Sequence, residues 1–486
     1  MQQIILELLS SQPAFQKLAD EIRSGNTQDQ LGLARATRIP FLAAVQAELN
    51  RPLLLITDKI DRALVLEDEW DFWFQDQPLT CFPEPDPLYY EKVAWSRKTR
   101  RDRLATLSLL SELMLPGAER KALPLIIAPV RALMTRTLPR RSFLKASRTI
   151  KSGSSYEPQT LAGEWVRSGY DPVPIVTAPG QFARRGGILD IWPPGDRFPS
   201  RLEFFGQEVE MLRRFDPQNQ RTIEKVDSIR ITPAREFLLP EDPLGDLDGK
   251  TYTEYHLPVL SSETATLLNY LPQDTVIFLD DGVAVRDSAK EICAQAESLR
   301  KGYQADGLIK KDFPLPYLPW KDLKGALDKF NPVALGPAGE GSEAGFSAQF
   351  STNQRFGGEL KSFTSHLAEL IGVGEQAVIV SRQSARLEEV WKERTQLDSS
   401  PTYIKGSIDG GWAFKPVDGK PIHLFSDGEI FGWRRIQPRR RPVQRVLAPE
   451  INYADFQEDD WVVHIDHGIG RYLGLAFREL DGVLGE

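Results

Sequence analysis

The chain has 486 residues, of which 41% are apolar and 26% are charged, a composition typical of soluble globular proteins. At roughly 150 residues per domain, this length predicts three or four domains. Lysine and arginine total 60 and aspartate and glutamate total 68, so the formal net charge is −8. Because DNA and anionic membranes are negatively charged, this balance disfavours a general binder of either, and any nucleic-acid contact needs a local basic patch.

Cys81 and Cys293 are the only two cysteines. Two cysteines exclude a disulfide framework and a cysteine-rich zinc site, and they suit a reducing, cytoplasmic location. No run approaches the roughly 18 apolar residues of a membrane span, so no membrane contact is expected. The first 22 residues lack a basic start and predict two short amphipathic helices instead of a signal peptide, with apolar residues at helical spacing: Ile4, Leu8, Leu9, Phe15, Leu18 and Ile22.

Residues 1–145 predict an α/β domain, because the apolar runs at 52–57 and 123–130 each precede a helical pattern. Residues 146–235 predict mostly strands, including 187–192 and a hairpin over 201–212. Residues 236–345 return to α/β, with a strand at 275–279 and a Gly/Ala/Pro-rich stretch at 331–346 that predicts a linker.

Residues 346–435 predict a further small α/β domain, with a strand at 377–381 and a helix at 384–391. A basic linker is expected at 436–454, and residues 455–486 are β-like. The fold class is therefore multidomain α/β.

Two motifs resemble parts of a nucleotide site. A phosphate-binding loop ending at Gly249-Lys250-Thr251 would need a glycine at position 244, where Leu244 stands in an acidic segment, so we interpret this match as coincidence. Asp280-Asp281 follows an apolar strand, as in the metal-holding motif of nucleoside triphosphatases. Without a phosphate cradle it is either a vestigial motif or an ordinary strand end.

No catalytic constellation is visible, and the isolated pair His464 and His467 is weak evidence for a metal. We expect no cofactor in this chain.

The hairpin at 201–212 is more informative. Side chains alternate along a strand, so Arg201, Glu203 and Phe205 share one face while Leu202 and Phe204 share the other. An exposed phenylalanine beside arginine is typical of a protein-binding hot spot. The alternative is a sheet covered on both sides, with Phe205 buried. Arg184 and Arg185 precede the neighbouring strand and are candidates for the same patch.

Six arginines lie between positions 434 and 445, interrupted by prolines. This run is either a solvated linker or a contact to phosphates or an acidic partner. Its members are Arg434, Arg435, Arg439, Arg440, Arg441 and Arg445.

The motif GQFARRGGILDIWP at 180–193, with RLEFFG at 201–206 after it, looks like the domain shared by the repair protein UvrB and the bacterial transcription-repair-coupling factors (Mfd). The segment WVVHIDHGIGRY at 461–472 is similar to the start of the RNA-polymerase-interacting domain of the coupling factors, which UvrB lacks. The order of these motifs, and the missing phosphate loop, identify the chain as resembling the coupling factors.

The resemblance implies a degenerate UvrB-like module related to RecA/P-loop domains. Its two parts would be 1–145 and 236–345, with an α+β UvrA-binding domain inserted at 146–235. The DNA-clamping hairpin of UvrB is missing, because only about 30 residues separate Tyr89-Tyr90 from the next strand and most of them predict a helix, with Leu104, Leu107, Leu109 and Leu110 as its apolar residues. The domains at 346–435 and 455–486 would follow, the latter as the start of a small Tudor/CarD-like barrel that binds the RNA polymerase β subunit.

Residue by residue, the family's UvrA contacts fall on Arg185, Arg201 and Phe205. The resemblance also implies that the chain is an N-terminal fragment. The motor that uses ATP and magnesium to translocate on double-stranded DNA would then lie beyond Glu486. The sequence thus predicts an adaptor segment that recruits UvrA in transcription-coupled nucleotide-excision repair. The alternatives are a UvrB-type ATP-dependent helicase subunit and a general nucleic-acid binder acting through the 434–445 run.

Overall fold

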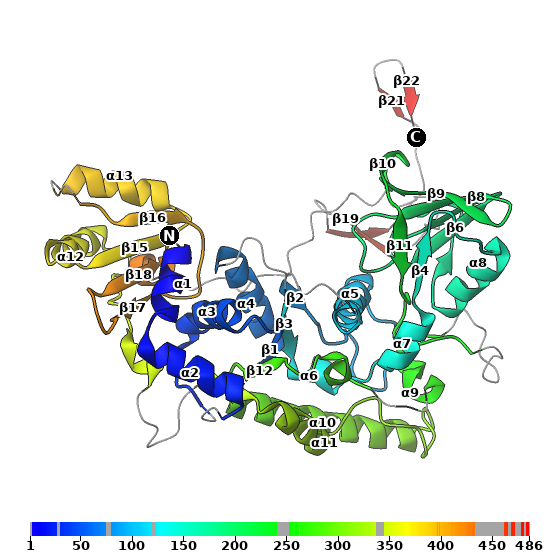
Figure 1. Cartoon of the computed structure of the whole chain (residues 1–486), viewed down its shortest axis with the longest axis horizontal. Helices are drawn as coiled ribbons and strands as arrows, with labels where there is room; N and C mark the ends of the chain where they lie inside the picture. Colours follow the sequence, from blue (N-terminus) through cyan, green and yellow to red (C-terminus); the bar gives the residue numbers. More distant parts are fainter. Residues whose placement is uncertain are drawn as a thin grey trace.

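A computed structural model describes residues 2–26, 30–73, 79–115, 117, 123–240, 252–261, 263, 265–336, 345–395, 397, 399–432, 461–464, 468–471, 478–480 and 483–485. Three sheet-containing regions lie along its long axis, with the first in the middle, the second at the right and the third at the left beside the N-terminus (Figure 1). None of the described helices is long and apolar enough to cross a membrane. The expected mixed α/β, multidomain class with a parallel sheet is confirmed.

The first region is built on a five-stranded parallel sheet in the order β13-β12-β1-β3-β2. Strands far apart in sequence are direct neighbours, since Leu53 pairs with both Val276 and Leu125. The strands are β1 (Leu53–Thr57), β2 (Leu79–Cys81), β3 (Leu125–Pro129), β12 (Val276–Leu279) and β13 (Val333–Ala334).

Both faces of this sheet are buried, which explains why its strands read as continuous apolar runs. Leu53 and Leu55 belong to a core with α1 to α4, whereas Leu54 and Ile56 belong to a second core with α5, α6, α10 and α11. The helices are α1 (Gln2–Ser10), α2 (Pro13–Ser24), α3 (Arg38–Leu49), α4 (Ile60–Trp73), α5 (Arg97–Leu113), α6 (Val130–Met134), α7 (Arg140–Ala146), α9 (Leu257–Leu260), α10 (Gly282–Ala305) and α11 (Trp320–Leu327).

Two expectations for this region need correction. The stretch at 331–346 is not simply a linker, because β13 lies inside it, pairs with β12 and has both residues buried. The first amphipathic helix exists, but it buries Ile5, Leu6 and Leu9 and leaves Ile4 exposed. A helix whose residues are mostly apolar allows its buried stripe to shift by one position.

The second region contains an antiparallel sheet extended by one parallel edge strand, in the order β10-β9-β8-β7-β6-β5. The predicted hairpin is β8–β9, and its turn contains Gly206 at φ +64, a left-handed conformation that glycine adopts readily. A ladder of β4 and β11 and helix α8 complete the region. The elements are β4 (Arg148–Lys151), α8 (Pro158–Arg167), β5 (Asp171–Pro172), β6 (Gln181–Arg185), β7 (Ile188–Ile191), β8 (Ser200–Phe205), β9 (Glu208–Phe215), β10 (Thr222–Lys225) and β11 (Ser228–Ile231).

A buried ion pair joins the second region to the first. Arg103 on α5 donates to both carboxylate oxygens of Glu236, at 2.6 and 2.9 Å, and both side chains are fully buried. The Arg103 guanidinium also lies over the rings of Phe82 and Trp95. These contacts anchor the end of the inserted region to the helix that covers the parallel sheet.

The third region has a five-stranded mixed sheet in the order β14-β17-β18-β15-β16, which contains the predicted strand and helix as β15 and α13. Val378, Val380 and Trp412 belong to the same core as α1 to α4, so the third region packs directly on the first. Its elements are β14 (Phe350–Ser351), α12 (Leu360–Gly372), β15 (Gln376–Ser381), α13 (Ser384–Arg394), β16 (Thr402–Lys405), β17 (Trp412–Phe414), β18 (Ile422–Ser426) and α14 (Asp427–Phe431).

Two short hairpins are described near the end of the chain, in agreement with the β-like pattern. They consist of β19 (Trp461–His464) with β20 (Gly468–Arg471), and β21 (Arg478–Leu480) with β22 (Val483–Gly485). The arginine run at 434–445, the Gly249-Lys250-Thr251 match and His467 lie outside the described residues.

Candidate functional site

Strands β7 and β8 bring a buried acid next to the predicted arginines. Asp190 lies opposite Arg201 in the β7–β8 ladder and opposite Ala183 in the β6–β7 ladder. Its side chain is almost fully buried. An unpaired carboxylate is very costly in such a position, so Asp190 requires charged partners.

Two arginines supply these partners. Arg201 donates from Nε and Nη2 to the two oxygens of Asp190, at 2.6 and 2.8 Å, in the bidentate geometry that suits a guanidinium and a carboxylate. Arg185 donates from Nη2 to the same carboxylate at 2.7 Å. Arg201 also lies over the Phe215 ring, 4.5 Å from its centroid, and donates to Gln220 Oε1. The hydrogen bond to Asp190 raises the pKa of Arg201, so the guanidinium stays charged. We call Arg185, Asp190 and Arg201 the arginine clamp.

Phe205 lies at the end of β8 with 79% of its surface exposed. Leu202 is buried and Phe204 packs against the same core, so the hairpin has one core face and one open face. Of the two alternatives that the strand pattern allowed, the structure shows the open one. An exposed phenylalanine beside charged arginines is the composition of an interface anchor.

The three predicted residues differ in what they present to solvent. The side chain of Arg185 is 47% exposed, whereas that of Arg201 is only 14% exposed. Arg184, which the sequence grouped with them, contacts Gln159 on α8 and lies on the opposite face of β6. Glu203, on the same face as Arg201, pairs with Arg213 on β9.

Sequence reasoning missed Asp190. One signal was available: Asp190 is an acid within the otherwise apolar strand 188–191. It also lies within the motif at 180–193 that resembles the UvrB-type domain. A carboxylate in an apolar strand needs a cationic partner, and its neighbours in the sheet are not visible in sequence alone.

The acids at the end of β12 are held by protein groups. Asp280 accepts from Arg38 Nη1 at 2.7 Å and from Arg62 Nε at 2.8 Å. Burial alone would raise the pKa of Asp280, but the hydrogen bonds and charges of Arg62 and Arg38 outweigh it, and the pKa lies below its ordinary value. Arg62 also reaches Asp409 of the third region, at 3.2 Å.

Asp281 has a different partner. Its Oδ1 accepts from the backbone N–H groups of Val283 and Ala284, so it caps the N-terminus of α10. At the neighbouring strand, only Asp58 and Lys59 separate β1 from α4, which is too short for a phosphate-binding loop. Both carboxylates therefore act as structural acceptors in this arrangement.

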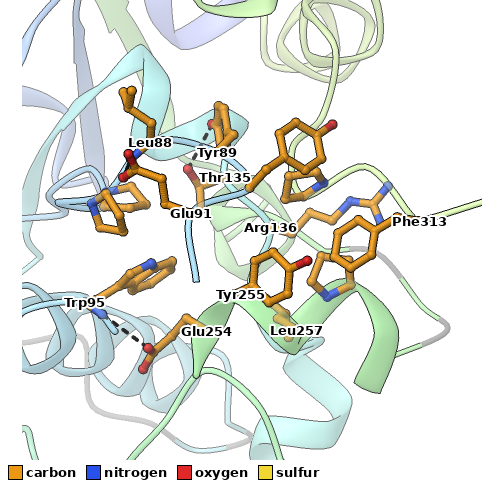
Figure 2. A pocket seen from close by; sticks show the side chains of 15 residues that line it. Leu88, Tyr89, Glu91, Trp95, Thr135, Arg136, Glu254, Tyr255, Leu257 and Phe313 are labelled. Atoms are coloured by element: carbon orange, nitrogen blue, oxygen red, sulfur yellow. Dashed lines mark hydrogen bonds between the residues drawn. The ribbon is translucent and has the colours of Figure 1, made fainter. Parts of the chain in front are cut away.

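An aromatic pocket lies elsewhere in the first region (Figure 2). Tyr255 stacks on Phe313 with centroids 5.1 Å apart, and the hydroxyls of Tyr89 and Thr135 lie 3.1 Å from each other. The backbone N–H of Trp95 points to Glu254 across the pocket. Its volume of about 40 Å³ has room for a few water molecules but not for a nucleotide.

Two family models match parts of the chain. Residues 149–237 match the UvrB interaction domain, which covers the whole arginine clamp and Phe205. Residues 456–486 match the CarD-like/TRCF RID domain. The combination defines a protein with a UvrB-type interaction domain followed by a coupling-factor-type domain.

Curated relatives extend the likeness to nearly the whole chain. The transcription-repair-coupling factors of Bacillus subtilis and Myxococcus xanthus are 24% and 26% identical to it, over 96% and 97% of the chain. The protein of the same name from Staphylococcus aureus is 22% identical over 98% of the chain. The chain spans 44% of the length of each of these relatives. The resemblance to the bacterial transcription-repair-coupling factors, with a UvrB-like module and the start of the polymerase-interacting domain, is thereby confirmed.

Proposed function

We propose that this chain is an adaptor in transcription-coupled nucleotide-excision repair, and that its second region recruits UvrA. The observation that carries this proposal is the exposed Phe205 beside the partly exposed Arg185, within the residues that match the UvrB interaction domain. The proposed interface places acids of UvrA against the arginine clamp and an apolar pocket around Phe205.

The similarity of the chain to transcription-repair-coupling factors supports further proposals about a complete protein of this kind. Residues 456–486 would begin a small barrel that contacts the β subunit of RNA polymerase, in the cytoplasm. A complete protein would displace stalled polymerase by translocating on double-stranded DNA with ATP and magnesium. We assign neither ATP nor magnesium to a residue of this chain, because Asp280 and Asp281 already accept hydrogen bonds from protein groups. The first region would then be a degenerate RecA-like domain.

The recruitment proposal is tested by measuring the Kd between the chain and purified UvrA. The triple variant Arg185→Ala/Arg201→Ala/Phe205→Ala removes two arginines and one exposed apolar residue, and we expect at least a hundredfold weaker binding, on the scale of about 1.4 kcal/mol per tenfold.

A matched control removes the same chemistry elsewhere in the second region. Arg184→Ala/Arg221→Ala/Ile223→Ala also deletes two arginines and one exposed apolar residue, on the other face and on the far edge of the sheet. We expect this control to keep the wild-type Kd. Equal binding by the wild type and the first triple variant would refute the proposal. The polymerase contact can be measured in the same format with RNA polymerase in place of UvrA.

A further inference from the structure

The arginine clamp contains Asp190, a buried carboxylate to which the proposed function assigns no role. We propose that Asp190 is a positioning residue, which holds Arg185 and Arg201 in the geometry that recognises a carboxylate-bearing partner. The inference rests on the proposed function, since it concerns the same surface. It assigns a role in binding to a side chain that is itself too deeply buried to touch a partner.

The charges of this face leave a surplus that points outward. Arg185, Arg201 and Arg213 are positive, and Asp190 and Glu203 are the carboxylates with which they pair. Strand pairing adds Glu208, opposite Phe205, and Lys225, opposite Arg213, to the same face. Four cations against three carboxylates leave one uncompensated positive charge. Because Asp190 is buried and Arg185 is half-exposed, this charge is presented at the surface on Arg185. An acidic partner is the chemistry that fits it.

The hydrogen bonds fix which atoms remain for a partner. Arg201 uses Nε and Nη2 for Asp190 and Gln220, and Arg185 uses Nη2 for Asp190. Within the described part of the chain, Nη1 of either arginine donates no hydrogen bond to an acceptor. The Nη2 groups of both arginines donate to the same oxygen, Asp190 Oδ2, so the two guanidinium groups are neighbours. A pair of fixed donors suits a carboxylate on the partner.

Preorganisation is the physical gain. A free arginine side chain loses rotamer freedom when it is immobilised at an interface, and that loss weakens binding. In the clamp, Asp190 and the Phe215 ring already restrict Arg201, and Asp190 restricts Arg185. Without the Asp190 carboxylate, Arg185 and Arg201 would keep their charge, but their side chains would no longer be held in one orientation by a common acceptor. A purely electrostatic role predicts the opposite result, because removing a negative charge would tighten binding to an acidic partner.

The test is a set of Kd measurements with UvrA on the full 486-residue chain. Asp190→Asn keeps the shape of the side chain and removes its charge, and we expect roughly tenfold weaker binding. In the Arg185→Ala/Arg201→Ala background the same substitution should have no further effect. In the Phe205→Ala background it should again weaken binding roughly tenfold, because Phe205 lies four residues from Arg201 along β8 and takes no part in the described hydrogen bonds of Asp190. Unchanged or tighter binding by Asp190→Asn would overturn the inference, and so would an equal loss in the double-arginine background.

Two further variants separate positioning from folding. Glu203→Gln removes a carboxylate of the same face that pairs with Arg213 and not with the clamp, and should change the Kd less than about threefold. Arg201→Lys keeps the positive charge next to Asp190, but a lysine cannot bind the carboxylate through two parallel N–H groups, so we expect a loss of affinity similar to that of Asp190→Asn.

If Asp190→Asn does not fold, the Kd of Arg201→Lys tests the inference instead, and wild-type affinity of that variant would refute it. If the Arg185→Ala/Arg201→Ala variant itself keeps wild-type affinity, the proposed function fails, whereas a loss there without one in Asp190→Asn refutes only this inference.

Discussion

The first and second regions each contain a buried aspartate held by two arginines, and they differ in how much of those arginines reaches the surface. Around Asp280, the side chains of Arg38 and Arg62 are 4% and 11% exposed. Around Asp190, Arg201 is similarly covered, but Arg185 is half-exposed and Phe205 protrudes nearby. The two ionic clusters therefore differ in what they present to solvent.

The difference follows from where each acid lies in its sheet. Asp280 ends a central strand of a parallel sheet that is covered on both faces, so its partners must come from within the protein. Arg62 also pairs with Asp409, which makes this cluster a link between the first and third regions. Asp190 shares its face of an antiparallel sheet with Arg201 and with the buried Phe215, and Arg185 at the margin of this covered part stays half-exposed. Exposure of an arginine distinguishes this cluster, which we propose as a recognition surface, from the structural cluster at Asp280.

The largest expected effect is on stability, at Asp280. Asp280→Asn removes the carboxylate that pairs with Arg38 and the closer of the two carboxylates that pair with Arg62, and breaking a buried pair in this way costs about 3–5 kcal/mol. We expect the urea midpoint of the first unfolding transition to fall accordingly, while the Kd for UvrA stays unchanged in the folded protein. A stability loss below about 1 kcal/mol would show that the cluster is not a structural link.

A smaller effect is expected from acid. The pKa of Asp280 lies below its ordinary value in the folded protein, so its contribution is complete above the unfolded pKa of about 4 and is lost as the pH falls through the lower folded value. The difference in unfolding free energy between the wild type and Asp280→Asn should therefore be largest near pH 7. It should shrink as the pH falls below the unfolded pKa of about 4, as measured by urea unfolding at each pH. A difference that grows on acidification would contradict the lowered pKa.

The smallest effect is expected at Phe205. Because this side chain is mostly exposed, Phe205→Ala should change the unfolding free energy by no more than about 0.5 kcal/mol while it weakens UvrA binding. Urea unfolding and the Kd are measured on the same preparation. A stability loss above about 1 kcal/mol would mean that Phe205 packs against the protein, and the contrast with Asp280 would then disappear.

Several elements follow from sequence patterns. The apolar runs at 53–57 and 125–129 predict strands because a sheet covered on both faces needs continuous apolar residues. The hairpin with Gly206 and the helix at 97–113 are readable from local signals in the same way. The strand at 333–334 is not, because two residues amid glycine and proline form a strand only where a neighbouring strand offers its edge.

The sequence alone determined the order of the regions, the resemblance to the coupling factors and the three candidate contact residues, because these depend on local patterns and motifs. The tertiary structure decided which of those residues are exposed and which groups hold them. Asp190 and Arg201 meet only through the pairing of β7 with β8, and Asp280 meets Arg38 and Arg62 only when distant parts of the chain fold together. Burial, which makes each carboxylate demand its arginines, is a property of the folded protein and not of any segment.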